Sequence, residues 1–476
     1  MPDLSAVAIG PLATVEGCVV ALEAGIITAP ELVDQGLERI EQLDGPKGLN
    51  AVITVAPSAA EDAQASHQRR ATGRPRSPLD GIPFTVKDCI EVAGMPTTHG
   101  SRIFEHWIPE VDSPVVARLK AAGMVLLAKV SLDDFAAACF GESSLKGWMR
   151  NPHDPGRQVG GSSGGSAVAV AAGYAPMSLG TDTGGSLRIP AALCGVATLR
   201  PTSGALSLAG IFPRSPSQDT VGPMTTTIAG LQLTWAALHR NHNSNPPHLA
   251  PPMTAPQLRL GVVEGGLAIW GDDPQGPVLE RFRQLLGELS NAGAYLVPVE
   301  APPRDLLDQS VAIPHEAIPA VDSYLARPGM PVRDFCDLLT AGREGGMSAH
   351  ALTTFERHAT HRISSDEVAQ VYVRRSDLRD YTHRLLETYD IDAVIYPSVQ
   401  RTALPLGEEQ SGVFTRWSEH TGFPAVGVPM GITAPGDGPC SAELLAPAGA
   451  DDRLLTIAAV VERHALHGLT ARRESA

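Results

Sequence analysis

The sequence predicts an α/β fold in which a sheet is covered by helices, and three observations favour this class. Short apolar runs, VITV (52–55), MVLLAKV (124–130) and YAPMSLG (174–180), alternate with stretches of helical periodicity. Residues 258–300 form a strand, helix, strand unit, which favours parallel neighbours in a sheet. Of the 476 residues, 43% are hydrophobic and 19% are charged, as in an ordinary folded globular chain.

The first fifty residues are expected to be helical. Thr28 stands at a helix N-cap position, and a proline and an acidic first turn follow it before LVDQGLERIEQL (32–43). The apolar run GIPFTV (81–86) is expected to be a strand that ends at Lys87. Residues 131–140 are expected to form a further helix.

The second half of the chain continues the alternation. Its unit at 258–300 consists of LRLGVVEG, the helical PVLERFRQLLGELSNAG, and AYLVPVE. DAVIYPS (392–398) and PAVGVPMG (424–431) are expected to be buried strands, and LLTIAAVVERHAL (454–466) a final helix. Residues 241–257 are rich in proline and asparagine and are expected to be an irregular connection.

Charge and cysteine usage exclude several classes of protein. The net charge is -15 and the basic residues are not clustered, so nucleic acid is not an expected partner. No cation precedes Arg39, and no stretch approaches the roughly 18 uncharged apolar residues of a membrane helix, so a cytoplasmic protein without a membrane partner is expected. The six cysteines form no C-x-x-C pair, which argues against a disulfide framework and a thiolate metal site.

Two turns rich in glycine and serine carry the candidate chemistry. GGSSGGS (160–166) runs directly into a small-residue helix pattern, and GTDTGGSLRIP (180–190) follows an apolar run. In the second turn, the backbone N–H groups of Thr183, Gly184, Gly185 and Ser186 would be unpaired at a helix start and could hold an oxyanion. A serine hydroxyl in either turn still needs a base to become a good nucleophile.

Lys87 is the candidate base. The chain has five lysines among 37 Lys and Arg residues, and Lys87 stands at the end of an apolar strand. Burial there would lower its pKa and keep the amine neutral, which arginine cannot match.

Other motifs allow other interpretations. GGSSGG also fits G-x-S-x-G, the nucleophile elbow of α/β-hydrolases, with Ser162 or Ser163 at its centre. SSLK (143–146) fits S-x-x-K, but no S-D-N or K-T-G follows, so a surface role is expected for Lys146. Three H-x-x-H pairs lack the glutamate of H-E-x-x-H, and solvated helix faces are expected for them: His239/His242, His358/His361 and His464/His467.

Taken together, Lys87 in GIPFTVKD, GGSSGGS and GTDTGGSLRIP resemble the amidase signature family in order and spacing. The resemblance implies a Ser-Ser-Lys triad without histidine, in which Ser186 is the nucleophile, Ser162 the bridging serine and Lys87 the base. It also implies a cis peptide bond after Gly161 and an oxyanion hole of N–H groups from Thr183 to Ser186. Supporting roles are implied for Gly161, Ser163, Asp182 and Arg188.

The resemblance covers nearly the whole chain. It implies an α/β/α fold with a large, mixed, twisted sheet in one domain (1–476), with a helical start (1–75), a signature core (80–230), a variable middle (235–370) and a C-terminal part (380–470) that completes the sheet. Tentative substrate-binding residues are Phe140, Trp148, Arg379 and Trp417. No metal or cofactor is implied.

The expected function is hydrolysis of carboxylic amides, by extension of carbamates and esters, through an acyl-enzyme on Ser186. The expected partner is a small-molecule amide or carbamate, and the sequence allows a homodimer. The alternative is the A subunit of a glutamyl-tRNA amidotransferase, which recognises glutamine through an arginine and an acid. Arg379 matches the former, but Gly412 stands where the acid is expected, which favours a stand-alone amidase. A binding protein without catalysis would leave Lys87 unexplained.

Overall fold

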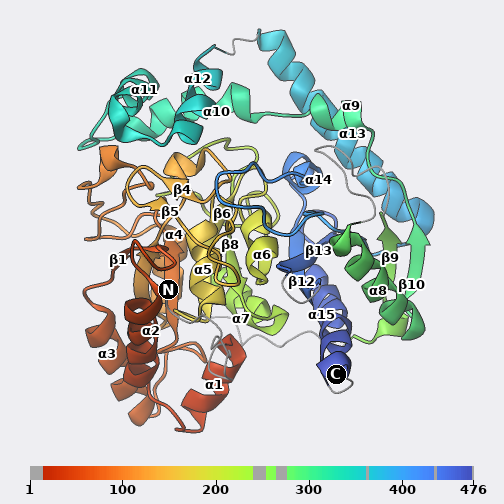
Figure 1. The fold of residues 1–476 in the computed structure, drawn as a ribbon, viewed down its shortest axis with the longest axis horizontal. Coiled ribbons are helices and arrows are strands. Elements are labelled where there is room, and N and C mark those ends of the chain that lie inside the picture. The colour runs from red at the N-terminus through yellow and green to blue at the C-terminus, as the bar shows by residue number, and fades with distance from the viewer. Residues whose placement is uncertain (1–13, 240–252, 264–275, 361–363, 434–436, 474–476) are drawn as a thin grey trace.

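A mixed sheet organises the chain in the computed structural model, which describes residues 14–239, 253–263, 276–360, 364–433 and 437–473 (Figure 1). Eleven strands of the described residues run in the order β1-β3-β2-β6-β8-β7-β12-β13-β11-β9-β10, and β4 pairs with β5 separately. The strands are β1 (Val52–Val55), β2 (Pro83–Lys87), β3 (Val125–Val130), β4 (Glu142–Ser143), β5 (Gly147–Trp148), β6 (Met177–Asp182), β7 (Ala197–Arg200), β8 (Thr220–Thr225), β9 (Arg259–Val262), β10 (Tyr295–Pro298), β11 (Ala393–Tyr396), β12 (Ala425–Ile432) and β13 (Pro439–Leu445).

Helices cover both faces of this sheet, which confirms the predicted α/β/α class. The small-residue helix α5 and helix α6 pack on one face, and α4, α7, α8 and α15 pack in a larger apolar cluster on the other. The described α-helices are α1 (Val15–Glu23), α2 (Ala29–Leu43), α3 (Ala59–Ala71), α4 (Pro114–Ala121), α5 (Gly164–Ala171), α6 (Arg188–Cys194), α7 (Ile228–His239), α8 (Pro277–Asn291), α9 (Arg304–Asp308), α10 (Ile313–Leu325), α11 (Phe335–Ala341), α12 (Ala349–Thr360), α13 (Ser365–Tyr389), α14 (Arg416–Thr421) and α15 (Asp451–Arg473).

Three parallel strands place their carboxyl ends at one edge of the sheet. β2 pairs in parallel with β3 on one side and with β6 on the other. The last residues of β2 and β6 are Lys87 and Asp182, so both predicted functional segments begin at this edge. Open α/β sheets usually bind ligands at the carboxyl ends of their strands. In Figure 1, α10, α11 and α12 lie together beyond the strands at the top of the view.

The sequence predicted most elements correctly. The apolar runs at 52–55, 124–130, 392–398 and 424–431 coincide with strands, and the unit at 258–300 contains the parallel pair β9 and β10. Most of 241–257 lies outside the described residues. No helix of the described residues is both long and apolar enough to span a bilayer.

The helix predicted at 131–140 is wrong. Only a 3₁₀ turn forms there, at Asp134–Ala136, and Phe135 and Ala136 have φ values of 54° and 55°. The buried carboxylate of Asp133 accepts the backbone N–H groups of Phe140 and Gly141, which turns the chain back on itself. A side chain that bonds the backbone locally competes with helix formation in this way.

The N-cap predicted at Thr28 is confirmed as a full capping box. Its backbone N–H donates to Glu31 Oε2 at 2.7 Å, and its hydroxyl accepts the N–H of Glu31. We expect Thr28→Ala to lower the free energy of unfolding by about 1 kcal/mol, because the backbone N–H of Glu31 in the first turn of α2 loses its acceptor. Denaturant unfolding measures this loss, and Thr28→Ser is the control that keeps the hydroxyl. An equal loss in both variants would contradict the capping role.

Candidate active site

Lys87 is fully buried at the end of β2 and contacts three hydroxyl groups. Its Nζ lies 2.7 Å from Ser162 Oγ, 2.8 Å from Thr181 Oγ1 and 3.0 Å from Ser163 Oγ. None of its described contacts is an ion pair with a carboxylate. Burial lowers the pKa of Lys87 below the ordinary value of 10.5, and the negative charges of Asp133 and Asp182 offset this effect only in part.

A second buried lysine, Lys129, has the carboxylate partner that Lys87 lacks. Lys129 is also fully buried, but its Nζ lies 2.7 Å from Asp88 Oδ1. It also donates to the carbonyl of Pro96 at 2.9 Å. Lys129 thus has the partners of a structural cation, whereas Lys87 faces only neutral hydroxyls.

The first serine turn brings Ser162 and Ser163 to Lys87. The peptide bond between Gly161 and Ser162 is cis, as the resemblance implies. A Cβ atom on Gly161 would collide with the buried carboxylate of Asp133, so this position accepts only glycine. The Ser163 hydroxyl donates to the carbonyl of Thr181 at 2.9 Å, which ties the turn to the end of β6.

The second serine turn connects β6 to α6 and carries Ser186. Gly185 has φ +91°, and a Cβ atom there would lie 2.8 Å from Thr415, so glycine is required for both reasons. The carbonyl of Ser186 accepts the N–H of Ser163 at 3.1 Å, which joins the two turns. No hydrogen bond between described residues links the hydroxyls of Ser186 and Ser162.

The backbone N–H groups of the second turn divide into two sets. Gly185 N–H donates to Asp182 Oδ1 at 3.0 Å, so the expectation that it is free for an oxyanion is wrong. The N–H groups of Thr183, Gly184 and Ser186 have no hydrogen-bond partner among the described residues. Three unpaired donors therefore remain in this turn.

Asp182 and Arg188 form the buried ion network that supports this turn. Arg188 Nε lies 3.1 Å from Asp182 Oδ2, and its Nη1 lies 2.9 Å from Glu443 Oε1. Its Nη2 lies 3.3 Å from Glu419, and Arg200 adds a second contact to Asp182 at 2.9 Å. The two guanidinium groups hold the pKa of Asp182 far below its usual value despite complete burial.

Ser186 lies on the wall of a pocket of about 610 Å³. Thr183 and Gly184 line the same pocket, so the unpaired N–H groups and the serine face one space. The apolar wall consists of Ala136, Ala137, Ala138, Cys139, Val311, Ile313 and Pro314, and the polar remainder of Arg214, Thr354, Arg357, His358 and Thr360. Residues of α10 and α12 therefore close the pocket over the strand ends.

The four tentative substrate-binding residues do not line this pocket. Trp417 is fully buried, donates from Nε1 to Thr382 Oγ1 at 2.8 Å and stacks on Tyr396, so its predicted role is wrong and it belongs to the core. Among the described residues, the one hydrogen bond of the Arg379 side chain on α13 is a long one to the carbonyl of Thr421, at 3.5 Å. Gly412 packs beside Gln400 and Arg401 and likewise lies off the pocket wall.

Phe140 and Trp148 contact α12 instead of the pocket. The Phe140 ring stacks on His350 with centroids 3.8 Å apart, and the Trp148 ring meets His350 edge-on at 6.0 Å. These contacts hold the first turn of α12, which carries pocket residues further along the same helix.

The histidines need one correction. His358 is buried and lines the pocket, so the expectation of a solvated helix face is wrong for it. Its predicted partner His361, like His242, lies outside the described residues. Among the described residues, the hydroxyls of Ser162 and Ser163 bond to Lys87 and to no histidine.

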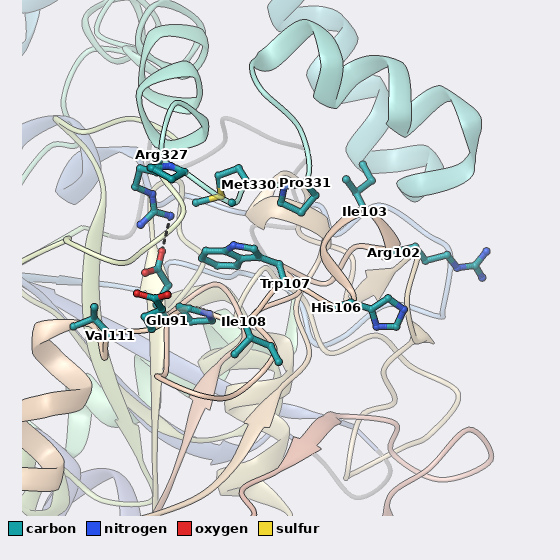
Figure 2. Close-up of a pocket in the computed structure, with 14 residues that line it drawn as sticks. Glu91, Arg102, Ile103, His106, Trp107, Ile108, Val111, Arg327, Met330 and Pro331 are labelled. Atoms are coloured by element: carbon teal, nitrogen blue, oxygen red, sulfur yellow. Dashed lines mark hydrogen bonds and ion pairs between the residues drawn. The ribbon is translucent and has the colours of Figure 1, made fainter.

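A pocket larger than the one at Ser186 lies elsewhere in the described residues. It measures about 890 Å³ and runs between residues 102–111 and 327–331 (Figure 2). At one end Arg327 forms an ion pair with Glu91 at 2.7 Å, and Trp107 and Met330 lie across the centre of the view. No residue of the two serine turns lines it.

Comparisons with known proteins show the family to which the chain is similar. The sequence profile of the family described as Amidase matches residues 31–455. The A subunit of the glutamyl-tRNA(Gln) amidotransferase of Salinispora arenicola is 34% identical, and the match covers 92% of this chain and 94% of that one. The corresponding protein of Cutibacterium acnes is 34% identical over 92% of each chain.

Solved structures match over the same extent. The native peptide amidase from Stenotrophomonas maltophilia superposes with a TM-score of 0.84 at 28% identity, covering 98% of both chains. The A subunit of the glutamyl-tRNA(Gln) amidotransferase from Thermotoga maritima superposes with a TM-score of 0.73 at 27% identity, covering 97% of this chain and 96% of that one.

Proposed function

Because the chain belongs to the amidase family and is an enzyme that hydrolyses C–N bonds, we propose that it is a stand-alone amidase with a Lys87, Ser162, Ser186 triad. One observation carries the proposal: Lys87 Nζ is fully buried, lacks a carboxylate partner and lies 2.7 Å from Ser162 Oγ. A neutral amine in this position can accept a proton, which a serine nucleophile requires.

The hydrogen bonds around Lys87 support the choice of Ser162 as the bridge. A neutral amine has two N–H donors and one lone pair. Because the Ser163 proton is already committed to the carbonyl of Thr181, Ser163 can only accept from Lys87. The lone pair of Lys87 is then available for the hydroxyl proton of Ser162.

The proposed reaction follows from this arrangement. Ser186 Oγ attacks the acyl carbon as its proton passes to Ser162 and the Ser162 proton passes to Lys87. The side chain of Ser186 turns toward Ser162 when substrate binds. The N–H groups of Thr183, Gly184 and Ser186 hold the oxyanion, and removing one such donor typically costs about 10² to 10³ in turnover. The protonated Lys87 returns its proton through Ser162 to the leaving nitrogen, and water then releases the acyl group.

The pocket supports small amides with an apolar body, and the same carbonyl chemistry extends to carbamates and esters. An apolar substrate is favoured by the apolar pocket wall, which includes Ala136, Val311, Ile313 and Pro314. Trp417 no longer supports this preference, because it does not line the pocket.

We expect the protein alone to release 4-nitroaniline from a short acyl 4-nitroanilide and to carry an acyl group on Ser186 during turnover. Acid quenching followed by mass spectrometry of the peptide that contains Ser186 tests the second part, because an acyl-enzyme adds the mass of the acyl group. A matching carbamate measures the preference between the two substrate types. If aniline is released while acylation is found on another residue, the triad assignment fails.

The amidotransferase subunit is the second candidate, because the curated relatives at 34% identity carry that name. The argument against it from Gly412 no longer applies, since Gly412 lies off the pocket wall. The higher TM-score to the peptide amidase supports the stand-alone enzyme. A protein inert on both anilide and carbamate, yet able to release ammonia from glutamine once partner chains are added, would favour the amidotransferase role.

A further inference from the structure

Arg214 is a buried cation on the wall of the Ser186 pocket, and no carboxylate of the described residues forms an ion pair with it. Arg214 is 4% exposed, and its Nη1 has no hydrogen-bond partner among the described residues. No ion pair joins its guanidinium to any described carboxylate. Its contact is with the face of the Phe355 ring, at 5.0 Å from the centroid. Although burial lowers the pKa of Arg214 to about 10, the group is charged at neutral pH.

Other buried arginines of the described residues are paired. Arg188 and Arg200 contact the Asp182 carboxylate, and Arg375 donates to the carbonyls of Glu419 and His420. Buried charges in folded proteins are paired as a rule, because an isolated charge is costly to desolvate. The unpaired guanidinium of Arg214 therefore points to a partner that arrives with a ligand.

The acid nearest to Arg214 along the chain cannot serve as that partner. Asp219 Oδ1 accepts the Thr183 hydroxyl at 2.5 Å. Its Oδ2 accepts the backbone N–H groups of Arg214 and Ser215 at 2.9 and 3.0 Å. Asp219 thus fixes the backbone of Arg214 and leaves its guanidinium to the pocket.

Arg357, the other arginine among the described pocket residues, adds a second positive charge. Arg357 on α12 lines the pocket and is exposed, whereas no aspartate or glutamate is among the described lining residues. This is notable in a chain with a net charge of -15, which repels anions elsewhere. A pocket with two guanidinium groups and no carboxylate concentrates anionic ligands.

We propose that the substrate cleaved at Ser186 carries a carboxylate, which Arg214 binds inside the pocket and Arg357 attracts at its rim. The inference rests on the proposed function and narrows its substrate class to anionic amides, such as half-amides of short dicarboxylic acids. The apolar wall at Ala136–Ala138 and Ile313 suits the methylene chain between the two carbonyl groups.

A pair of anilides of equal shape tests the proposal. Succinyl 4-nitroanilide carries a carboxylate, and 4-oxopentanoyl 4-nitroanilide carries a methyl ketone in its place. We expect the wild type to show a kcat/KM about 10- to 100-fold higher for the anionic anilide, as a charge-assisted pair allows. We expect Arg214→Met to abolish this preference through a larger loss of kcat/KM on the anionic anilide than on the ketone, and Arg357→Met to reduce it. Arg384→Met, an exposed arginine on α13, is the matched control and should keep it.

The folding of the variant separates a binding role from a structural one. Because Arg214 has no carboxylate partner to orphan, Arg214→Met should not lower Tm. Equal wild-type rates on the two anilides, or a preference that survives in Arg214→Met, would overturn the proposal and leave the amidase function standing.

A binding measurement keeps the two proposals distinguishable. Succinyl 4-nitroanilide should bind to Ser186→Ala by calorimetry and bind about 10- to 100-fold more weakly when Arg214→Met is added. If the wild type releases no aniline from either anilide, the amidase proposal fails, and this binding result alone decides the anion site. Equal affinity with and without Arg214 would overturn it.

Discussion

Replacing Lys87 by alanine should lower kcat by about 10³ to 10⁶-fold while the protein remains folded, and Ser186→Ala should do the same. Lys87 contacts three hydroxyls and no described carboxylate, so its loss removes the proposed base without leaving an ion-pair partner behind. Because the two residues act as one unit, the double variant should be no worse than either single one. Release of 4-nitroaniline measures the rates, and circular dichroism checks the fold.

Lys87→Arg and the pH dependence test whether Lys87 acts as a base. Arginine keeps a cation in place but cannot be deprotonated, so this variant should be as inactive as Lys87→Ala. In the wild type, kcat/KM should rise with pH as Lys87 loses its proton and then level off. Since burial lowers the pKa of Lys87, the midpoint should lie below 10.5.

Lys120→Ala is the matched control for these variants. Lys120 is partly exposed and pairs with Asp112 at 2.9 Å. None of its described contacts is with a serine turn, so Lys120→Ala should leave the rate of 4-nitroaniline release unchanged. Substantial activity in Lys87→Arg would show that Lys87 contributes charge and not proton transfer, and a histidine base would then have to be sought.

Arg188→Met should lower the free energy of unfolding by about 3 to 5 kcal/mol, the largest stability effect that we expect in this chain. The guanidinium of Arg188 contacts Asp182, Glu443 and Glu419, and all of these groups are buried. Removing it leaves carboxylates desolvated without their principal partner. Denaturant unfolding measures the loss.

Two controls separate burial from charge in this measurement. Arg188→Lys keeps the positive charge and should lose less than Arg188→Met. Arg333→Met removes an ion pair with Asp337 in which the arginine side chain is 85% exposed, so its effect should be far smaller than that of Arg188→Met. If Arg188→Met cost no more than Arg333→Met, the network would not stabilise the fold.

The sequence predicted the elements and turns that depend on local patterns. Apolar periodicity located the strands β2 and β6, which pair in parallel in the sheet. The glycines of the two serine turns were informative because Gly161 and Gly185 meet neighbours that leave no room for a Cβ atom. Capping chemistry at Thr28 is equally local, which is why its prediction is confirmed.

The pocket walls could not be predicted in this way, because they depend on which distant segments meet. Trp417 was expected at the pocket from its loop and composition, yet it fills the core beside Tyr396. Arg214 and Arg357 lie 143 positions apart in the chain and carry no local motif, so only the fold brings them to one space. An arginine after GIFP is visible in the sequence, but its lack of a partner is not.

The two sides of the pocket come from different parts of the chain. The proposed nucleophile and proton path belong to β2, β6 and the serine turns, whereas α10 and α12 supply the opposite wall. Substitutions in that wall can therefore alter which amide is accepted without touching the hydrogen bonds of Lys87. Such a division lets substrate choice diverge between descendants of one ancestor while the reaction itself is inherited unchanged.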